Sequence, residues 1–286
     1  MAPKSRGRDP VGPARCGVSA LELDALRADL VQEQDELDAL VAPLSEAQWL
    51  LATPSVGWNV ADQIGHLTYF DGSAVNAIVD PERFQTELGD LLEGALAEGL
   101  DTFTLGAFRT LSSHQQLAAW RHNRAALAKA VLQLGVDTRV DWYGPSMGSR
   151  SFLTARLMEV WAHGTDVADA LGVDRPATER LRHVAQLGFI TRRWSYKVRG
   201  EEPPGGTVRL ELSGPTAEIW TWGDDDAADV IRGTAKDFCL VVTQRRHVDD
   251  TSLETGELGR HWLLRAQAFA GTPSTGPEPR SIDGAR

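Results

Sequence analysis

The sequence predicts a mainly α-helical protein, in which an N-terminal up-and-down bundle of four main helices is followed by a small α+β domain. In residues 18–198, apolar side chains recur at spacings of three and four, which is the pattern of amphipathic helices. The segment GEEPPGG (200–206) is typical of a linker, and residues 207–223 then alternate between apolar and polar side chains, as strands do. A chain of 286 residues is long enough for two such domains.

Capping signals set the limits of the predicted helices. Ser19 and Glu22 form a capping-box pattern before the first apolar stripe, and Asn59 with Asp62 in the next turn indicates the start of the second helix. Residues 80–112 are less periodic, so we expect a loop and a short helix there. A short extended piece precedes the fourth helix. The helices expected from these signals span residues 19–41, 59–78, 113–135, about 150–172 and 177–197.

The last third of the chain combines strand and helix signals. Residues 207–214 and 217–223 are predicted strands joined by a tight Gly-Pro turn. A further short strand leads into a helix that begins near Thr234, and a last helix is expected over residues 257–271. The predicted organisation is a disordered tail (1–17), the helical bundle (18–198), the small α+β domain (199–272) and a frayed tail (273–286).

Composition argues against several classes of partner. The net charge is −11, and because residues 1–17 carry +3, the remainder carries −14 and would repel nucleic acid. No apolar run approaches the roughly 18 residues of a membrane span, and the N-terminus lacks the apolar core of a secretory signal. The two cysteines, Cys16 and Cys239, provide no disulfide framework. We therefore expect a cytoplasmic protein that acts on a small molecule, as a monomer or a homodimer.

The fourth predicted helix carries a polar stripe beside its apolar one. Arg156, Glu159, His163 and Asp166 follow one another at helical spacing. This stripe is compatible with a solvated face that carries an Arg156–Glu159 ion pair. Because a Glu and a His four residues apart point the same way, it is equally compatible with two ligands that reach one cation.

A third ligand is available on the second predicted helix. His66 lies about 120° around that helix from its apolar stripe, and a histidine in such a place is commonly a hydrogen-bonded structural residue. In an antiparallel bundle, however, side chains of two helices can converge inside. His66, Glu159 and His163 would then form a site with open positions, the pattern of catalytic rather than structural zinc. The other histidines show no such spacing.

Two segments resemble a known family. GWNVADQIGHLTYFD (57–71) and ARLMEVWAHGTDVADALG (155–172) are similar to the two metal-binding segments of the DinB/YfiT-like superfamily. Within it, they resemble the branch of mycothiol-dependent maleylpyruvate isomerases and actinobacterial relatives. The resemblance covers residues 18–198 well and the C-terminal part more loosely. It implies a DinB-like bundle and assigns His66, Glu159 and His163 as ligands of a divalent metal, usually zinc.

The resemblance also implies a reaction. Family members use mycothiol as a thiol cofactor, which implies an isomerase or S-transferase that attacks a small electrophilic metabolite with a metal-bound thiolate. The family places an arginine of the C-terminal domain at the active-site cleft, and Arg245 is the nearest match, with Arg246 adjacent. The segment FCLVVTQRRH departs from the family's small-residue ending, so Arg245 is equally compatible with a surface arginine at a helix C-terminus.

Other interpretations of the same residues stay open. The three ligands would also serve a metal-dependent hydrolase or a lyase/cyclase that uses no thiol, or a non-catalytic protein that binds a metal or a small molecule. Asp62 and Asp166 are candidates to orient an imidazole, and both are compatible with capping or surface roles. The aromatic and sulfur side chains that flank the ligand segments are candidates for a pocket wall or for plain core: Trp58, Trp142, Tyr143, Met147 and Trp161.

Overall fold

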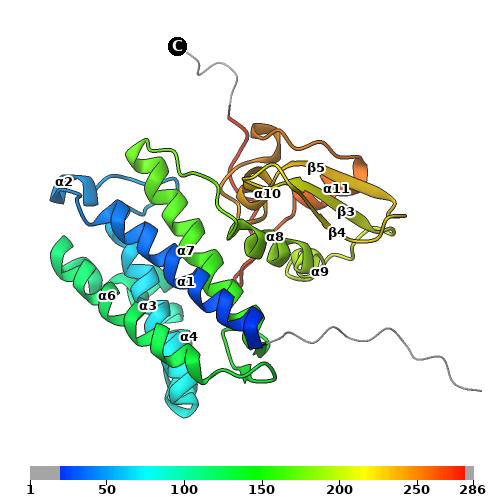
Figure 1. Cartoon of the computed structure of the whole chain (residues 1–286). Helices are drawn as coiled ribbons and strands as arrows, with labels where there is room; N and C mark the ends of the chain where they lie inside the picture. The colour runs from blue at the N-terminus through cyan, green and yellow to red at the C-terminus, as the bar shows by residue number, and fades with distance from the viewer. Residues whose placement is uncertain (1–19, 281–286) are drawn as a thin grey trace, which may run out of the picture.

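The computed structural model describes residues 20–280 and shows a helical bundle beside a small three-stranded sheet with its own helices (Figure 1). The expected tail 1–17 and the end of the expected frayed tail, 281–286, lie outside the described residues. In the bundle, α7 lies between α1 and α3, and α3 also packs against α6. The four main helices are α1 (Ala20–Val41), α3 (Val60–Val79), α6 (Ser113–Ala130) and α7 (Ser149–Leu171).

Side-chain caps begin the helices largely where the sequence predicts. Asn59 and Asp62 form a reciprocal capping box at the start of α3. The capping box of α6 is formed by Ser112 and Gln115, one residue earlier than expected. Gly172 ends α7 with a φ of 66°, a left-handed conformation that costs glycine little. Shorter elements connect the main helices: α2 (Glu46–Trp49), the 3-10 helix η2 (Val131–Gln133), and the hairpin of β1 (Arg139–Val140) and β2 (Met147–Gly148).

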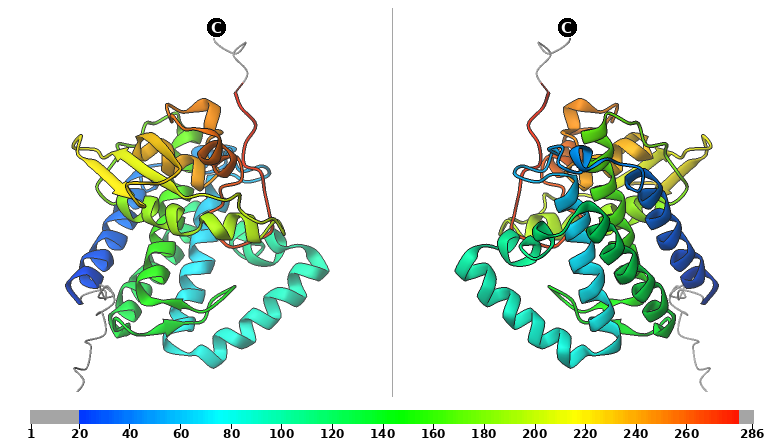
Figure 2. Two further views of the ribbon diagram at one scale, coloured as in Figure 1. Left: turned by 90° about the vertical axis from the view of Figure 1, so that its right-hand side faces the viewer. Right: turned by 90° about the vertical axis from the view of Figure 1, so that its left-hand side faces the viewer.

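The expectation for residues 80–112 is wrong, because most of this segment is helical. It forms α4 (Pro81–Glu98), α5 (Leu100–Leu105) and the 3-10 helix η1 (Phe108–Thr110). Figure 2 shows α4 running outward at an angle to α3 before the chain returns. Because α4 buries only Phe84 and Leu91, it needs no continuous apolar stripe, and its start depends on the Asp80 cap before Pro81. Gly94 allows the ring of Phe103 to pack against α4, since a Cβ there would lie 2.0 Å from that ring.

The predicted fifth helix is two helices, α8 (Leu181–Ile190) and α9 (Arg192–Lys197). The break falls at Thr191, whose hydroxyl donates to the carbonyl oxygen of Leu187, one turn back. A threonine hydroxyl that bonds back in this way bends a helix. The consequence is that α8 alone packs between α7 and α10.

The sheet follows the predicted strands, with one pairing that was not foreseen. Strand β3 (Val208–Ser213) pairs antiparallel with β4 (Ile219–Trp222), and β5 (Asp229–Thr234) adds to its other edge in parallel, with Leu210 opposite Ile231. Thr234 caps α10 (Ala235–Val242), as expected. The remaining elements are the 3-10 helix η3 (Val248–Asp250) and α11 (Glu257–Leu263).

The last helix is shorter than predicted. It ends at Leu263 instead of continuing to residue 271. The backbone N–H of Ala268 donates to the carbonyl oxygen of Val242 at the end of α10, at 2.9 Å. After α11 the chain therefore turns toward α10, where Ala268 provides a donor for a carbonyl group that has no partner within α10.

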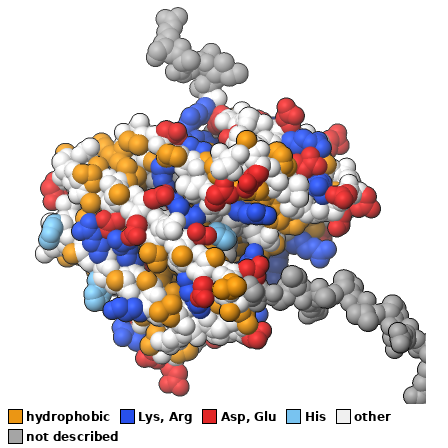
Figure 3. All heavy atoms as spheres, viewed as in Figure 1, with side chains coloured by type: hydrophobic (Ala, Val, Ile, Leu, Met, Phe, Trp, Pro, Cys, Tyr) orange, Lys and Arg blue, Asp and Glu red, His pale blue; other side chains and the backbone are white. Residues whose placement is uncertain are grey.

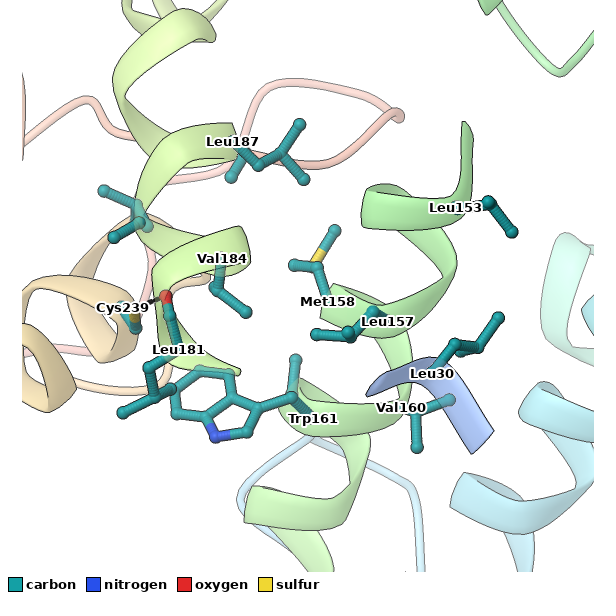
Figure 4. Close-up of a cluster of buried hydrophobic side chains, with 14 of the residues drawn as sticks. Leu30, Leu153, Leu157, Met158, Val160, Trp161, Leu181, Val184, Leu187 and Cys239 are labelled. Atoms are coloured by element: carbon teal, nitrogen blue, oxygen red, sulfur yellow. Dashed lines mark hydrogen bonds between the residues drawn. The ribbon is translucent and has the colours of Figure 1, made fainter. Parts of the chain in front are cut away.

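One connected hydrophobic core joins the bundle and the sheet. Figure 4 shows part of it, where Leu157, Met158 and Trp161 of α7 face Leu181, Val184 and Leu187 of α8. On the face shown in Figure 3, acidic and basic side chains are interspersed with hydrophobic ones. Among residues 20–280, none of the helices combines the length and the apolar character needed to span a membrane.

Candidate metal centre

The packing of α3 against α7 brings together the three side chains that the sequence singled out. Nε2 of His66, on α3, lies 3.3 Å from Oε2 of Glu159, and Nε2 of His163 lies 3.1 Å from the same oxygen. One atom from each residue falls within 4.8 Å of the other two. Among residues 20–280, this is the only group of three or more His, Cys, Asp or Glu residues with that geometry.

These distances fit a single bound cation. Ligand atoms about 2.0–2.2 Å from a tetrahedral zinc ion stand about 3.4 Å apart, close to the two separations between the imidazole nitrogens and Oε2 of Glu159. The side chains of His66 and Glu159 are 18% and 22% exposed, so the group is reachable from one side. Two imidazoles and one carboxylate occupy three positions of a tetrahedron, which leaves a fourth for an exchangeable ligand.

The electrostatics of the trio also suit a cation. Burial, followed by the charge of His163, lowers the pKa of His66 to about 4, so its ring is neutral at pH 7. Burial opposes ionisation of Glu159, but its contacts with His163 and His66 outweigh burial and hold its pKa well below its usual value. A neutral imidazole and an ionised carboxylate are the forms that bind metals.

The alternative of a solvated face on α7 does not hold. Arg156 does not pair with Glu159; its Nη2 lies 3.0 Å from Oδ1 of Asp71 on α3, and both side chains are buried. Asp166 is also buried. The polar stripe of α7 therefore faces the interior and α3.

Aromatic rings lie beside the trio. The centroid of Trp58 lies 5.2 Å from that of His66 and 6.0 Å from that of His163, and Phe70 lies 4.5 Å from His66. Tyr143, on the β1–β2 hairpin, continues this wall at 5.3 Å from Phe70. Trp161, by contrast, is core, because it points toward α8 (Figure 4).

The two aspartates considered as imidazole partners bind other groups. Asp62 caps α3 and accepts from Nε of Arg109 at 2.8 Å. Asp166 accepts from Ser55 and from Nη2 of Arg245. The residue that contacts an imidazole is Gln63, whose Oε1 lies 2.5 Å from Nδ1 of His163. One signal for this contact was present in the sequence, since Gln63 is one turn before His66 and shares its helix face.

Arg245 follows α10 and lies against α7. Gln244, just before it, has a φ of 60°, and the N–H of Arg245 donates to the carbonyl oxygen of Leu240. This turn is a left-handed helix ending of the kind usually made by glycine. It aims Arg245 at Asp166, one helical turn beyond His163, with a side chain 13% exposed. Arg246, adjacent, pairs with Asp169 instead.

Comparison with known proteins agrees with the fold. The family model described as the mycothiol maleylpyruvate isomerase N-terminal domain matches residues 30–168. Crystal structures of the mycothiol-dependent maleylpyruvate isomerase and of a mutant of it share the fold with a TM-score of 0.55, at 16% identity, over 81% of this chain and 92% of theirs. The chain belongs to the DinB/YfiT-like superfamily, in the mycothiol-dependent maleylpyruvate isomerase branch.

Two relatives from Mycobacterium tuberculosis align with this chain along almost their whole length. They are named Uncharacterized protein Rv0036c (strain ATCC 25618 / H37Rv) and Uncharacterized protein MT0041 (strain CDC 1551 / Oshkosh). Each is 43% identical over 252 residues, which is 87% of this chain and 96% of the relative. The similarity therefore extends through the sheet as well as the bundle.

Proposed function

We propose that this protein is a divalent-metal-dependent enzyme that uses mycothiol to isomerise, or to conjugate, a small electrophilic metabolite. The observation that carries the proposal is the convergence of His66, Glu159 and His163 beside a wall of aromatic rings. The family model and the fold support the thiol-dependent class. Zinc is the metal that we propose, because two imidazoles and one carboxylate form one of its catalytic ligand sets.

The three ligands would hold the cation, and the side chains around them would hold the substrate. When bound, the cation would lower the pKa of a thiol and polarise a substrate oxygen. Trp58 and Phe70 flank His66 and offer apolar faces to the substrate's carbon skeleton. Because these rings pack against His66, whose side chain is 18% exposed, they would also limit the access of water to the reacting atoms.

Residues 20–280 supply no reactive thiol for this reaction. Cys239, the single cysteine among residues 20–280, is completely buried on α10, and its thiol contacts the carbonyl oxygen of Leu181. Burial raises its pKa well above the usual value, so it is not a nucleophile at neutral pH. An external thiol such as mycothiol fills that role.

Arg245 is our candidate for binding a substrate carboxylate. Its Nη2 contacts Asp166, while its Nε is buried without a hydrogen-bond partner. A carboxylate that replaced Asp166 could accept from both Nε and Nη2 in the bidentate geometry that arginine favours. Asp166 would keep the hydrogen bond from Ser55.

The outcome of thiol addition separates isomerase from transferase. If the thiol adds to a cis double bond, the bond becomes single and can rotate; expulsion of the thiol then leaves the trans isomer. If the adduct is released instead, the product is a thioether conjugate. Both outcomes begin with the same addition, so the same residues serve both.

The test is turnover of maleylpyruvate by zinc-loaded protein with and without mycothiol, followed by proton NMR. We expect conversion to the trans isomer, or a thioether, only when mycothiol is present. His66→Ala should abolish it, and His183→Ala should not, because His183 pairs with Asp29 away from the trio. Turnover of an ester or amide without thiol would favour a metal-dependent hydrolase, and tight metal binding without any product would favour a binding protein.

A further inference from the structure

A buried glutamine contacts one of the proposed ligands from behind. Gln63 is completely buried on α3, and its Oε1 lies 2.5 Å from Nδ1 of His163, the ring nitrogen that faces away from Glu159. On its other side, Nε2 of Gln63 lies 2.9 Å from the hydroxyl oxygen of Thr53. The direction of each hydrogen bond decides which nitrogen of His163 carries the proton.

Thr53 fixes the orientation of the Gln63 amide. The threonine hydroxyl has one hydrogen, which it donates to the carbonyl oxygen of Trp58 at 3.0 Å. Its oxygen is then an acceptor, so the group of Gln63 that faces it has to be the NH₂ donor. The amide oxygen is therefore turned toward His163, and since a carbonyl oxygen can only accept, Nδ1 has to donate.

The loop that supplies Thr53 is held in place by its own backbone. The N–H of Thr53 donates to the carbonyl of Trp58 at 2.9 Å, and the N–H of Val60 donates to the carbonyl of Leu51 at 3.1 Å. A two-residue bridge between Ala52 and Asn59 closes the loop at the start of α3. Thr53 thus presents its hydroxyl to Gln63 from a fixed position.

We propose that Gln63 is a positioning residue that holds His163 as the Nδ1–H tautomer, so that Nε2 is the nitrogen offered to the metal. The proposal rests on the metal centre of the proposed function. With the proton on Nδ1, a lone pair of Nε2 faces a carboxylate oxygen of Glu159 at 3.1 Å. Two acceptors at that distance repel each other unless a cation or a proton lies between them, so the Gln63 contact prepares the trio for a cation.

Long-range proton–nitrogen NMR of protein labelled with ¹⁵N-histidine reads the tautomer directly. In metal-free protein near pH 8, we expect His163 to be the Nδ1–H tautomer. Gln63→Leu removes the acceptor and should give a mixture of tautomers or the Nε2–H form. Its zinc affinity, measured by competition with a chromophoric chelator, should fall by about 10–100-fold, the usual cost of losing the partner of a metal-binding histidine.

Three further variants separate positioning from packing. Gln63→Glu keeps an acceptor at the same place and should keep the Nδ1–H tautomer. Thr53→Val leaves Gln63 in place but frees its amide to turn, and should give a smaller shift toward mixed tautomers. Gln34→Leu is the matched control: Gln34 is a buried glutamine of the same bundle that contacts Asp71 and should change neither the tautomer nor the zinc affinity. Circular dichroism verifies that each variant is folded.

The proposal would be overturned if His163 of the wild-type protein were the Nε2–H tautomer. It would also be overturned if Gln63→Leu kept the Nδ1–H tautomer and the zinc affinity of the wild type. If Gln63→Leu does not fold, an unchanged Nδ1–H tautomer in Thr53→Val would overturn it. Failure of wild-type protein to bind zinc would be a different result. It would remove the metal centre of the proposed function, whereas the tautomer measured without metal would still decide what Gln63 does.

Discussion

Nη2 of Arg245 lies 2.9 Å from Oδ2 of Asp166, which joins the segment after α10 to the helix that carries Glu159 and His163. Asp166 is almost completely buried, and its carboxylate is compensated by this arginine and by the hydroxyl of Ser55. The pair places Arg245 one turn of α7 from His163. Its loss should therefore affect both stability and the binding of an anionic substrate.

We expect Arg245→Ala to lower the free energy of unfolding by about 3 kcal/mol, because removal of one partner leaves a buried charge uncompensated. In a double-mutant cycle with Asp166→Ala, urea unfolding should give a coupling free energy of at least about 1 kcal/mol. Arg245→Ala should also raise KM for a carboxylate substrate. Arg246→Ala breaks the neighbouring pair with Asp169 and serves as control. An equal rise in KM for both variants would count against a substrate contact for Arg245.

Removal of either histidine should abolish metal binding without unfolding the bundle. His66→Ala and His163→Ala each leave two of the three proposed ligands, which is too few for a stable zinc site. Elemental analysis of purified protein should show about one zinc per wild-type chain and almost none in either variant, with unchanged far-ultraviolet circular dichroism. Equal metal content in wild type and variants would show that the ion, if present, is bound elsewhere.

The contact between α1 and α6 should contribute to stability in a pH-dependent way. Hydrogen bonds from Arg121 lower the pKa of Asp38, against burial, and the charge of Arg124 adds to the effect. Because the pKa in the folded protein is below that of the unfolded chain, this stabilisation is present above about pH 4 and is lost as the pH falls through the folded value. Asp38→Asn should cost about 1–2 kcal/mol at pH 7. Urea titrations at pH 3 should show a smaller difference from wild type, and an equal one would contradict the assignment.

The packing of α8 against α10 leaves little room at Gly188. A Cβ there would lie 2.8 Å from Cγ2 of Val242 and 3.0 Å from Cε1 of Phe238. Gly188→Ala should therefore destabilise the protein by about 1–3 kcal/mol through overpacking. Gly89→Ala, in the exposed part of α4, has nothing within 4 Å of the new Cβ and should stabilise by about 0.5–1 kcal/mol through its helix propensity. Thermal unfolding should show a lower Tm for Gly188→Ala and a higher Tm for Gly89→Ala than for the wild type, and a shift of both in the same direction would contradict the prediction.

Much of the fold could be predicted because its signals are local. The N-cap at Asn59 and the helix start near Thr234 were predicted from short sequence patterns, and the structure confirms both. The parallel pairing of β3 with β5 could not be predicted in this way, since nothing in either strand specifies its neighbour. α4 was missed because periodicity detects buried faces, and this helix buries two side chains.

In the site too, local spacing could be predicted, whereas contacts between distant segments could not. Glu159 and His163 share a helix face by spacing alone, and the structure brings His66 to them from α3. The role of Gln63 cannot be predicted from spacing alone, because it depends on a loop hydroxyl from Thr53 and on a ring from another helix. For Asp62 and Asp166, spacing suggested an imidazole partner, but their carboxylates pair with Arg109 and Arg245 instead.

The position of α8 has a consequence for how the whole chain unfolds. Leu181, Val184 and Leu187 belong to one core cluster that includes residues of both α7 and α10. Unfolding of either the bundle or the sheet region would expose the core of the other to water. Denaturation should therefore be a single cooperative transition, detected equally by tryptophans in the bundle and in the sheet. A fragment that ends near residue 198 would expose the hydrophobic face of α8 that packs against α10. It should aggregate instead of folding as an independent bundle.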